Sequence, residues 1–320
     1  MTSSNAQGAL FSLLAFATFS THDTVVKFLG GAFSPFQVVF FSVLFGFPIV
    51  SIMLLRDRTD GNLLPRFPFW TFLRTAAQVV TTISVFYAFA TLPLAQTYAI
   101  LFASPLVITL MAIPILGETV GWRRGCAVVI GLLGVLIVVQ PGSTQLNFGH
   151  AMALLGAVCG ALASVIVRKV GREERNAVLM LYPMVANFLV MGAILPFVYE
   201  PMEAVHLGGV FLMAALAFAA TLLQIAAYRA ADAIIVAPMQ YSQIIWAVLF
   251  GWIFFEESLT WSTVLGASVI IGSGVYIVLR EEKSDTSETP VLDTKSRYAA
   301  GVMPRTGSFV RLLRRNRKTG

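Results

Sequence analysis

The six residues GETVGW at positions 117–122 end one long apolar run of the chain and begin the next. A second stretch of the same kind, EESLTW at 256–261, has the same position relative to the apolar runs that flank it. The offset from Glu118 to Glu257 equals the offset between the tryptophans that close the two stretches. The sequence therefore predicts one structural unit that occurs twice, with these stretches closing the fourth apolar run of each copy.

The composition around these stretches is that of a membrane protein. Of the 320 residues, 57% are hydrophobic and only 12% are charged, and the mean hydropathy is +0.80. An average soluble domain is about 45–50% apolar and about 25% charged, so this chain has too little polar surface for one. A soluble enzyme and a nucleic-acid-binding domain are thereby excluded, and an all-α integral membrane protein is predicted. The two cysteines and three histidines are scattered, so neither a metal nor another cofactor is expected.

Ten apolar runs are long enough to cross a bilayer, which takes about 20 residues. The ten predicted transmembrane helices are 8–28, 35–55, 69–91, 94–116, 122–140, 149–169, 177–199, 208–229, 235–256 and 261–280. The breaks between them are short, so consecutive helices are expected to run antiparallel, and no loop is long enough to hold a soluble domain.

The basic residues indicate how the chain is oriented. Lysine and arginine occur in alternate loops, at the span ends that border those loops, and in the tail from residue 281 to 320; apart from these, Lys27 and Arg74 fall within predicted spans. The positive-inside rule then places both termini in the cytoplasm, and a bacterial inner membrane is the expected location. The tail is expected to be disordered and basic, and its apolar end either lies on the anionic leaflet or stays solvated.

The two copies are expected to span residues 8–141 and 149–280. Lys27, at the end of the first span, matches Arg168 at the end of the sixth, with nearly the same offset as the two glutamates. Five spans is an odd number, so the second copy enters the membrane from the opposite side. Inverted repeats of this kind in secondary transporters place the substrate site at the repeat interface, near the middle of the bilayer.

At this level of detail the chain resembles the drug/metabolite transporter superfamily, in particular its EamA-type members with ten helices. The resemblance covers residues 8–280. In the first copy it rests on Pro105, LGE at 116–118, WRR at 122–124, GLLGV at 131–135 and PG at 141–142. The second copy repeats the pattern more loosely, with AP at 237–238, FEE at 255–257 and Gly272. The resemblance implies transport of a small solute. Many relatives have an arginine in the second span where this chain has Ser42, so Arg74 would have to hold any anionic group of the solute.

Polar side chains inside the spans predict a solute cavity. Gln240 and Gln243 are three residues apart, so both can face one cavity from a helix. Unpartnered amides are costly in lipid, and the alternative is that these groups form hydrogen bonds between helices that only hold the bundle together. The candidate substrate-binding residues are Gln78, Tyr98, Gln240, Tyr241, Gln243, Trp246 and Arg74.

Three residues of the first span are candidates for coupling to an ion: His22, Asp23 and Lys27. Charge within a membrane usually marks a pathway or a site. Asp23 and Lys27 are four residues apart on one helix face. Either Asp23 binds or relays a proton or cation while Lys27 tunes its affinity, or the two form a structural pair and Lys27 reaches the outer interface. His22 is a proton carrier or a hydrogen-bonded packing residue.

Other residues have expected structural roles. Glu118 and Glu257 are expected to cap helices or to pair locally, without carrying protons. Small residues at four-residue spacing predict close helix contacts. They are Gly156, Gly160 and Ser164 in the sixth span, and Ser268 and Gly272 in the tenth.

The sequence as a whole predicts a secondary transporter of a small organic metabolite that works by alternating access. It holds no phosphate-binding loop of an ATPase, and it is not expected to be an enzyme. An aromatic, amide-rich cavity suits a planar vitamin such as riboflavin. S-adenosylmethionine is an alternative, because Asp23, Lys27 and the stretch from Asp232 to Pro238 resemble its uptake carriers. Amino acids, drugs and a non-transporting membrane scaffold are further alternatives. The expected partners are the solute and the lipid bilayer, without nucleic acid, and a homodimer is left open.

Overall fold

The computed structural model describes residues 3–55, 63–118, 121–140, 147–170, 173–231 and 236–282. The predicted basic tail from residue 283 onward lies outside the described residues, and so do positions 232–235, which begin with Asp232. The elements are α1 (Ser3–Gly30), α2 (Pro35–Leu55), α3 (Pro68–Thr91), α4 (Leu94–Leu101), α5 (Ser104–Leu116), α6 (Trp122–Val139), α7 (Phe148–Val170), α8 (Asn176–Val198), α9 (Ala204–Ala230), the 3₁₀ helix η1 (Ala237–Ser242), α11 (Gln243–Phe255) and α12 (Trp261–Glu282).

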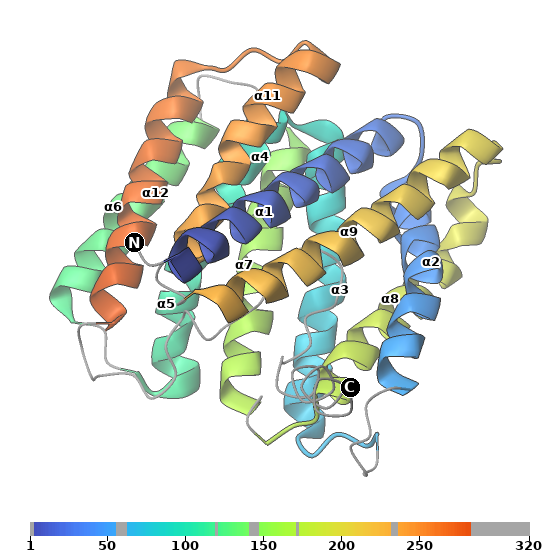
Figure 1. Ribbon diagram of the computed structural model, residues 1–320, viewed down its shortest axis with the longest axis horizontal. Coiled ribbons are helices and arrows are strands. Elements are labelled where there is room, and N and C mark those ends of the chain that lie inside the picture. Colours follow the sequence, from blue (N-terminus) through green and yellow to red (C-terminus); the bar gives the residue numbers. More distant parts are fainter. Residues whose placement is uncertain are drawn as a thin grey trace.

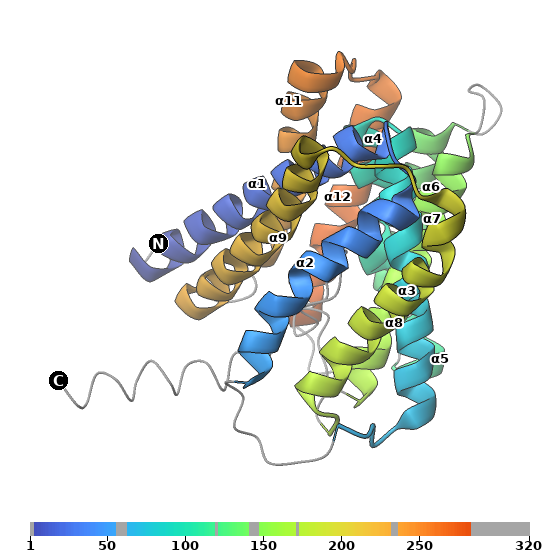
Figure 2. The same ribbon diagram turned by 90° about the vertical axis from the view of Figure 1, so that its right-hand side faces the viewer.

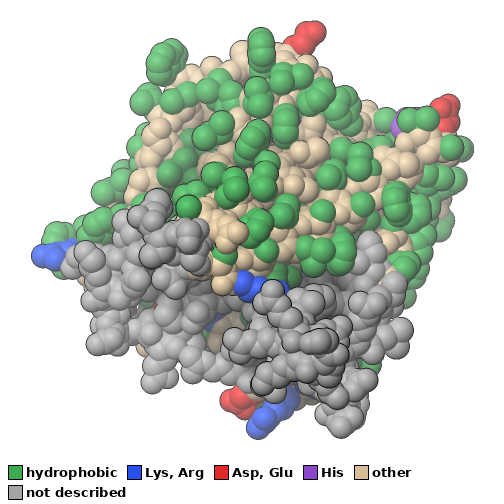
Figure 3. Space-filling view, in the orientation of Figure 1, with side chains coloured by type: hydrophobic (Ala, Val, Ile, Leu, Met, Phe, Trp, Pro, Cys, Tyr) green, Lys and Arg blue, Asp and Glu red, His purple; other side chains and the backbone are tan. Residues whose placement is uncertain are grey.

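The described residues form helices and contain no strand, which confirms the all-α prediction. Six helices are long and apolar enough to cross a membrane: Ala6–Gly30, Pro68–Thr91, Leu94–Leu116, Phe148–Val170, Ala177–Val198 and Ala204–Ala230. Apolar side chains are spread over the described part of the face shown in Figure 3, where few charged ones are visible. Phe197, Phe211 and Trp252 are among the large exposed apolar residues. A surface of this kind is suited to lipid, and the chain is a multi-pass membrane protein.

The helices pack in pairs that join the first half of the chain to the second. Figure 1 shows α1 and α9 side by side across the front of the molecule, with α6 beside α12, and Figure 2 shows α1 and α9 adjacent from a second direction. In the same way α3 packs on α7, α2 on α8, and α4 on α11. Each half of the chain therefore buries much of its apolar surface against the other half.

Two of the predicted spans are broken near their middle. The span 94–116 divides into α4 and α5, and the span 235–256 contains η1 followed by α11. Each of the two spans has a proline in the first turn of an element at the break: Pro105 is the second residue of α5, and Pro238 is the second residue of η1. Proline has no N–H group and its ring clashes with the preceding turn, so a continuous α-helix is interrupted there. The helices α5 and α11 are equally long, and the offset between their first residues equals that between Glu118 and Glu257.

These two helices end in the same way. The residue after each helix has a left-handed backbone, with φ of 74° at Gly117 and 54° at Glu256. The next N–H group then turns back into the helix: Glu118 N donates to the Ala112 carbonyl at 3.4 Å, and Glu257 N to Gly251 at 3.0 Å. This termination supplies hydrogen-bond donors to the last carbonyl groups of each helix. It also fixes the backbone position of the two glutamates.

Small residues permit close contact at two helix crossings. A Cβ on Gly156 would lie 2.8 Å from Val85 of α3, so this position packs as predicted. The α6–α12 contact differs from the prediction, because Gly272 has open space around it and Ser268 is exposed. Gly266 makes that contact instead: a Cβ there would lie 2.6 Å from the Gly134 carbonyl oxygen.

Candidate functional site

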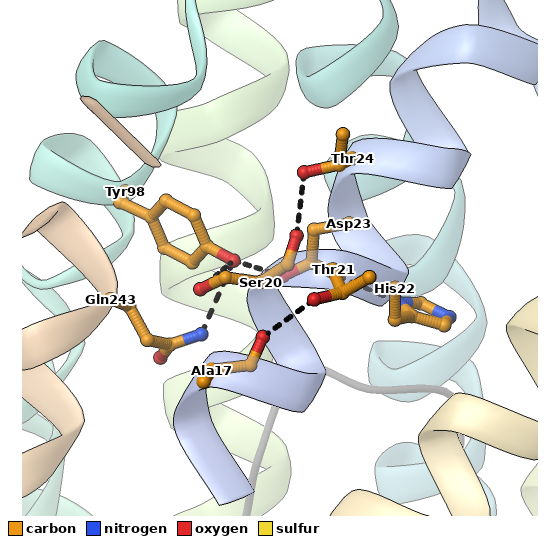
Figure 4. Close-up of polar contacts among 8 residues, drawn as sticks. All are labelled: Ala17, Ser20, Thr21, His22, Asp23, Thr24, Tyr98 and Gln243. Carbon is orange, nitrogen blue, oxygen red and sulfur yellow. Dashed lines mark hydrogen bonds and ion pairs between the residues drawn. The ribbon is translucent and has the colours of Figure 1, made fainter. Parts of the chain in front are cut away.

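A chain of hydrogen bonds connects α1, α4 and α11 in the interior of the protein (Figure 4). Gln243 Nε2 donates to the Tyr98 hydroxyl oxygen at 3.2 Å, and this hydroxyl donates to Oδ2 of Asp23. The other Asp23 oxygen, Oδ1, lies 2.7 Å from His22 Nδ1. We call these four residues the central cluster. His22, Tyr98 and Gln243 are buried, and the Asp23 side chain is 13% exposed.

The broken helices position two of these four side chains. Gln243 is the first residue of α11, directly after η1, and Tyr98 lies one turn before the end of α4. Along α1, Thr21 and Thr24 donate to the carbonyls of Ala17 and Ser20, so their hydroxyls are satisfied within the helix. The Asp23 carboxylate makes its own hydrogen bonds with His22 and Tyr98.

Aromatic rings surround the central cluster. The Tyr98 ring lies 5.2 Å from Phe89 and 6.0 Å from Phe102, measured between centroids. Phe102 in turn meets Tyr241 of η1 edge-on at 5.1 Å, and His22 meets Phe86 at 6.4 Å. A carboxylate and an amide inside an aromatic wall can bind a planar polar group or a cation.

Lys27 has its partner on another part of the chain, whereas one of the two alternatives from the sequence paired it with Asp23. Its Nζ atom lies 2.8 Å from Oε1 of Glu257 and 5.2 Å from the centroid of the Phe255 ring. It also donates to the Leu92 carbonyl at 2.5 Å. The structural pair of Asp23 with Lys27 is therefore not formed. The lysine stem carries the ammonium toward the end of α1, while Asp23 faces Tyr98 one turn earlier.

The two glutamates after α5 and α11 were expected to cap helices or to pair locally; both pair over long sequence distances instead, and Glu257 also binds the start of a helix. Glu257 binds Lys27 and also accepts the backbone N–H of Leu94, at the start of α4, at 2.9 Å. Glu118 Oε1 lies 2.6 Å from Nη2 of Arg168 on α7. These contacts were not predicted from the sequence. The nearly constant offset between the two copies, which relates Lys27 to Arg168 and Glu118 to Glu257, was the available indication that two equivalent pairs form.

The remaining predicted residues lie outside the central cluster. Arg74 donates from Nη1 to the Leu179 carbonyl of α8 at 2.5 Å. Gln78 is buried in α3, Gln240 is half-buried in η1, and the half-buried Trp246 ring lies 6.1 Å from Phe250. Tyr241 reaches the cluster only through Phe102. Of the predicted residues, the structure brings together His22, Asp23, Tyr98 and Gln243.

A pocket opens between the start of α4 and the end of α11. It is lined by Pro93, Ala95, Gln96, Ala247, Val248, Glu257, Ser258, Leu259, Thr260 and Thr263. Ala95, Ala247 and Thr263 are its buried members. Tyr98 is one turn beyond Ala95, and Gln243 is one turn before Ala247, so the pocket leads toward the central cluster. Among the described residues, no three His, Cys, Asp or Glu side chains are grouped so that they could hold a metal ion.

A multi-pass helical membrane protein with broken helices around a buried polar cluster has the architecture of a solute transporter. The chain belongs to the EamA-like transporter family, whose model matches residues 6–140 and again 147–280. This confirms the predicted family, and the protein is a membrane transporter of a small metabolite.

Curated relatives match nearly the whole chain. An S-adenosylmethionine uptake transporter of Rickettsia prowazekii (strain Madrid E) is 25% identical over 281 residues, which is 88% of this chain and 95% of that protein. A riboflavin transporter of Rhizobium johnstonii is 27% identical over 282 residues, 87% of this chain and 93% of its own. The pseudopaline exporter CntI of Pseudomonas aeruginosa (strain UCBPP-PA14) is 27% identical over 278 residues, 85% and 93% of the two chains.

Proposed function

We propose that this protein is a secondary transporter with ten spans in two inverted five-helix repeats, and that it works by alternating access. The observation that carries the proposal is the central cluster. Its members come from α1 and α4 in the first family match and from α11 in the second. A site shared by both halves changes its exposure when the halves move against each other, as transport requires.

The helix pairing supports the repeat. If the first and sixth spans are equivalent, then α1 on α9 and α7 on α3 are the same contact made twice. The pairs α2 with α8, α4 with α11, and α6 with α12 each join equivalent spans. The repeats are proposed as residues 8–141 and 149–280, in a bacterial inner membrane with both termini in the cytoplasm, as the basic loops predict.

S-adenosylmethionine is the solute that we propose first. The surroundings of the cluster favour a cation: Lys27 is paired with Glu257 and Arg168 with Glu118, whereas the Asp23 carboxylate lies against the imidazole of His22. S-adenosylmethionine carries a positive sulfonium group that a ribose joins to a planar adenine, which matches a carboxylate surrounded by aromatic rings. The uptake carriers similar to this chain support the same solute.

Riboflavin is the second candidate. Its ring system is planar, polar and uncharged, and the aromatic rings with the Gln243 amide offer stacking and hydrogen bonds. The similar riboflavin transporter supports this alternative. The two candidates differ in their need for Asp23, because only the cation requires its charge.

Asp23 is assigned to the cation of the transport cycle, either the coupling ion or the positive group of the solute. The Asp23→Asn variant distinguishes these roles. If the carboxylate binds a coupling ion, the variant still binds solute but no longer concentrates it. If the carboxylate is the counter-ion of the solute, binding itself is lost.

The experiment combines binding with transport. The purified full chain is heated with S-adenosylmethionine or riboflavin, and binding to the folded state raises its melting temperature. Uptake of each labelled solute is then followed in vesicles that contain the protein, with Tyr276→Phe on α12 as a matched variant outside the cluster. The proposed solute shifts the melting point and accumulates, and Gln243→Leu abolishes both effects. Binding that survives Gln243→Leu and Tyr98→Phe together overturns the assignment of the site.

The scaffold alternative has its own test. A chain that ends at residue 284 keeps transport activity if the protein is a carrier. If the protein acts only by presenting its basic tail, that truncation abolishes its function, and no solute accumulates with either form.

A further inference from the structure

Two largely buried ion pairs join the halves of the protein. Lys27 of α1 pairs with Glu257 after α11 at 2.8 Å, and these side chains are 13% and 15% exposed. Arg168 of α7 pairs with Glu118 after α5 at 2.6 Å, with exposures of 2% and 16%. In each pair the base comes from one half of the chain and the acid from the other.

The pairs lie at opposite ends of the same span. Glu257 accepts the N–H of Leu94, which begins α4, so the first pair is at the start of the span 94–116. Glu118 follows the end of α5, so the second pair is at the other end of that span. Since the span crosses the protein, one ion pair closes each side of the bundle.

The first pair also borders the route to the central cluster. Glu257 lines the pocket between α4 and α11, whose buried members include Ala95 and Ala247. Tyr98 and Gln243 lie one turn further inside on the same two elements. A solute that passes from this pocket to the central cluster would start beside Glu257 and move past the two alanines.

We propose that the two ion pairs are the gates of the transport cycle. The Lys27–Glu257 pair opens when the central cluster faces the side of the pocket, and the Arg168–Glu118 pair opens when it faces the opposite side. With both pairs closed, as in this structure, the cluster is occluded. This proposal rests on the alternating-access transporter proposed above and names the residues that hold each side shut.

Removing one acid weakens its gate selectively. Glu257→Gln keeps an oxygen that can accept the Leu94 N–H but loses the charge, so the Lys27 ammonium is buried without its counter-ion. An uncompensated buried charge is strongly unfavourable, and exposure to water relieves it. The variant therefore shifts the population toward opening at the side of the pocket. Glu118→Gln does the same at the other side through Arg168.

Two reporter positions measure the opening of each side. Ala247 and Ile108 are both buried and lie at equivalent places in the two copies, one near each gate. Each is replaced singly by cysteine in a background that carries Cys126→Ser and Cys159→Ala. A membrane-impermeant maleimide is added to inside-out or right-side-out membrane vesicles that contain the full chain. The labelling rate then reports access from each side without a known solute.

We expect Glu257→Gln to raise the labelling of the Ala247→Cys reporter about tenfold, without a rise at the Ile108→Cys reporter. Glu118→Gln reverses this pattern, and the reagent must act from the opposite face of the membrane. Lys27→Gln repeats the effect of Glu257→Gln from the basic side, which keeps the proposal testable if one variant folds poorly. Glu173→Gln is the matched control, because its pair with Arg66 is mostly exposed and contributes little to stability.

Two results would contradict the proposal that the ion pairs are gates. One is unchanged labelling in both acid variants. The other is an equal rise in labelling at both reporters, which indicates general loosening of the bundle. The readout is independent of transport. If no solute is accumulated but each acid variant exposes only its own reporter, the gates stand and the proposed solutes fail. If a solute accumulates while the reporters do not respond, transport stands and the gates fail.

Discussion

Gln243 and Tyr98 are linked by a hydrogen bond of 3.2 Å although they are 145 residues apart in the sequence. The bond has a direction: the amide of α11 donates to the hydroxyl of α4, and that hydroxyl donates to the carboxylate of Asp23. Hydrogen bonds in such a chain strengthen one another. A change of charge at Asp23 therefore alters the strength of the hydrogen bond made by Gln243, the first residue of α11, across the interface between the halves.

The hydroxyl of Tyr98 is the link whose removal is simplest to interpret. Tyr98→Phe keeps the ring contacts with Phe89 and Phe102 but leaves Asp23 without this donor and Gln243 without its acceptor. The loss of a buried partner costs about 1–3 kcal/mol, so uptake is expected to fall about tenfold or more. Initial uptake rates in vesicles measure this, with Tyr276→Phe on the exposed face of α12 as control. Equal rates for the two variants would rule out a role for the cluster.

The α6–α12 crossing depends on Gly266. Gly266→Ala would place a Cβ 2.6 Å from the Gly134 carbonyl oxygen and 2.4 Å from a methyl group of Val138. Overpacking of this kind costs about 1–3 kcal/mol, so the melting temperature in detergent should fall. Gly272→Ala, further along α12, meets open space and should leave the melting temperature unchanged or raise it slightly. Similar losses in the two variants would contradict the contact.

Gly251 provides room for the carboxylate of Glu257. A Cβ on Gly251 would lie 2.5 Å from Oε2 of Glu257, so Gly251→Ala must displace the group that holds Lys27. We expect a stability loss of about 1–3 kcal/mol from this clash. The mirror change Ala112→Gly, at the equivalent place in α5, should cost only about 1 kcal/mol through helix propensity. Thermal unfolding of both variants under the same conditions measures the difference between their losses of stability.

Arg74 tests whether a predicted solute ligand has a structural role instead. Its Nη1 donates to the Leu179 carbonyl, so Arg74→Gln should lower the melting temperature while the KM for uptake stays within about twofold. The measurement is a saturation curve for uptake at a temperature where the variant is folded. A large rise in KM with normal stability would instead assign Arg74 to the solute.

The sequence predicted the helical elements well because lipid imposes a simple length and polarity rule. A helix lies at each predicted apolar run, with ends close to those expected. The breaks in the fourth and ninth spans follow from Pro105 and Pro238, but their consequence for side-chain direction was harder to foresee. Gln240 and Gln243 were expected on one α-helical face. Gln240 lies in a 3₁₀ turn, where residues i and i+3 are nearly aligned, so their spacing does not explain why only Gln243, at the start of α11, joins the central cluster.

The partners of the charged residues could not be read from spacing along one helix. Asp23 and Lys27 have the separation of an intrahelical pair, yet each binds a residue of another element. Such choices depend on tertiary packing, which places Glu257 beside the end of α1 and Tyr98 beside its middle. The residue offset between the two copies relates the two ion pairs to each other, so it predicts the second pair once the first is known.

The Lys27–Glu257 pair also has a consequence for the biosynthesis of the protein. Glu257 directly follows the ninth span and Lys27 lies at the end of the first, so at about 5–20 residues per second the ribosome reaches the glutamate roughly 10–50 s after the lysine. Arg168 follows Glu118 by only 50 residues, and that pair is complete far sooner. During the interval the first helix carries a lysine whose counter-ion has not been made. The newly inserted chain must therefore keep this residue hydrated until the ninth span arrives and completes the assembly.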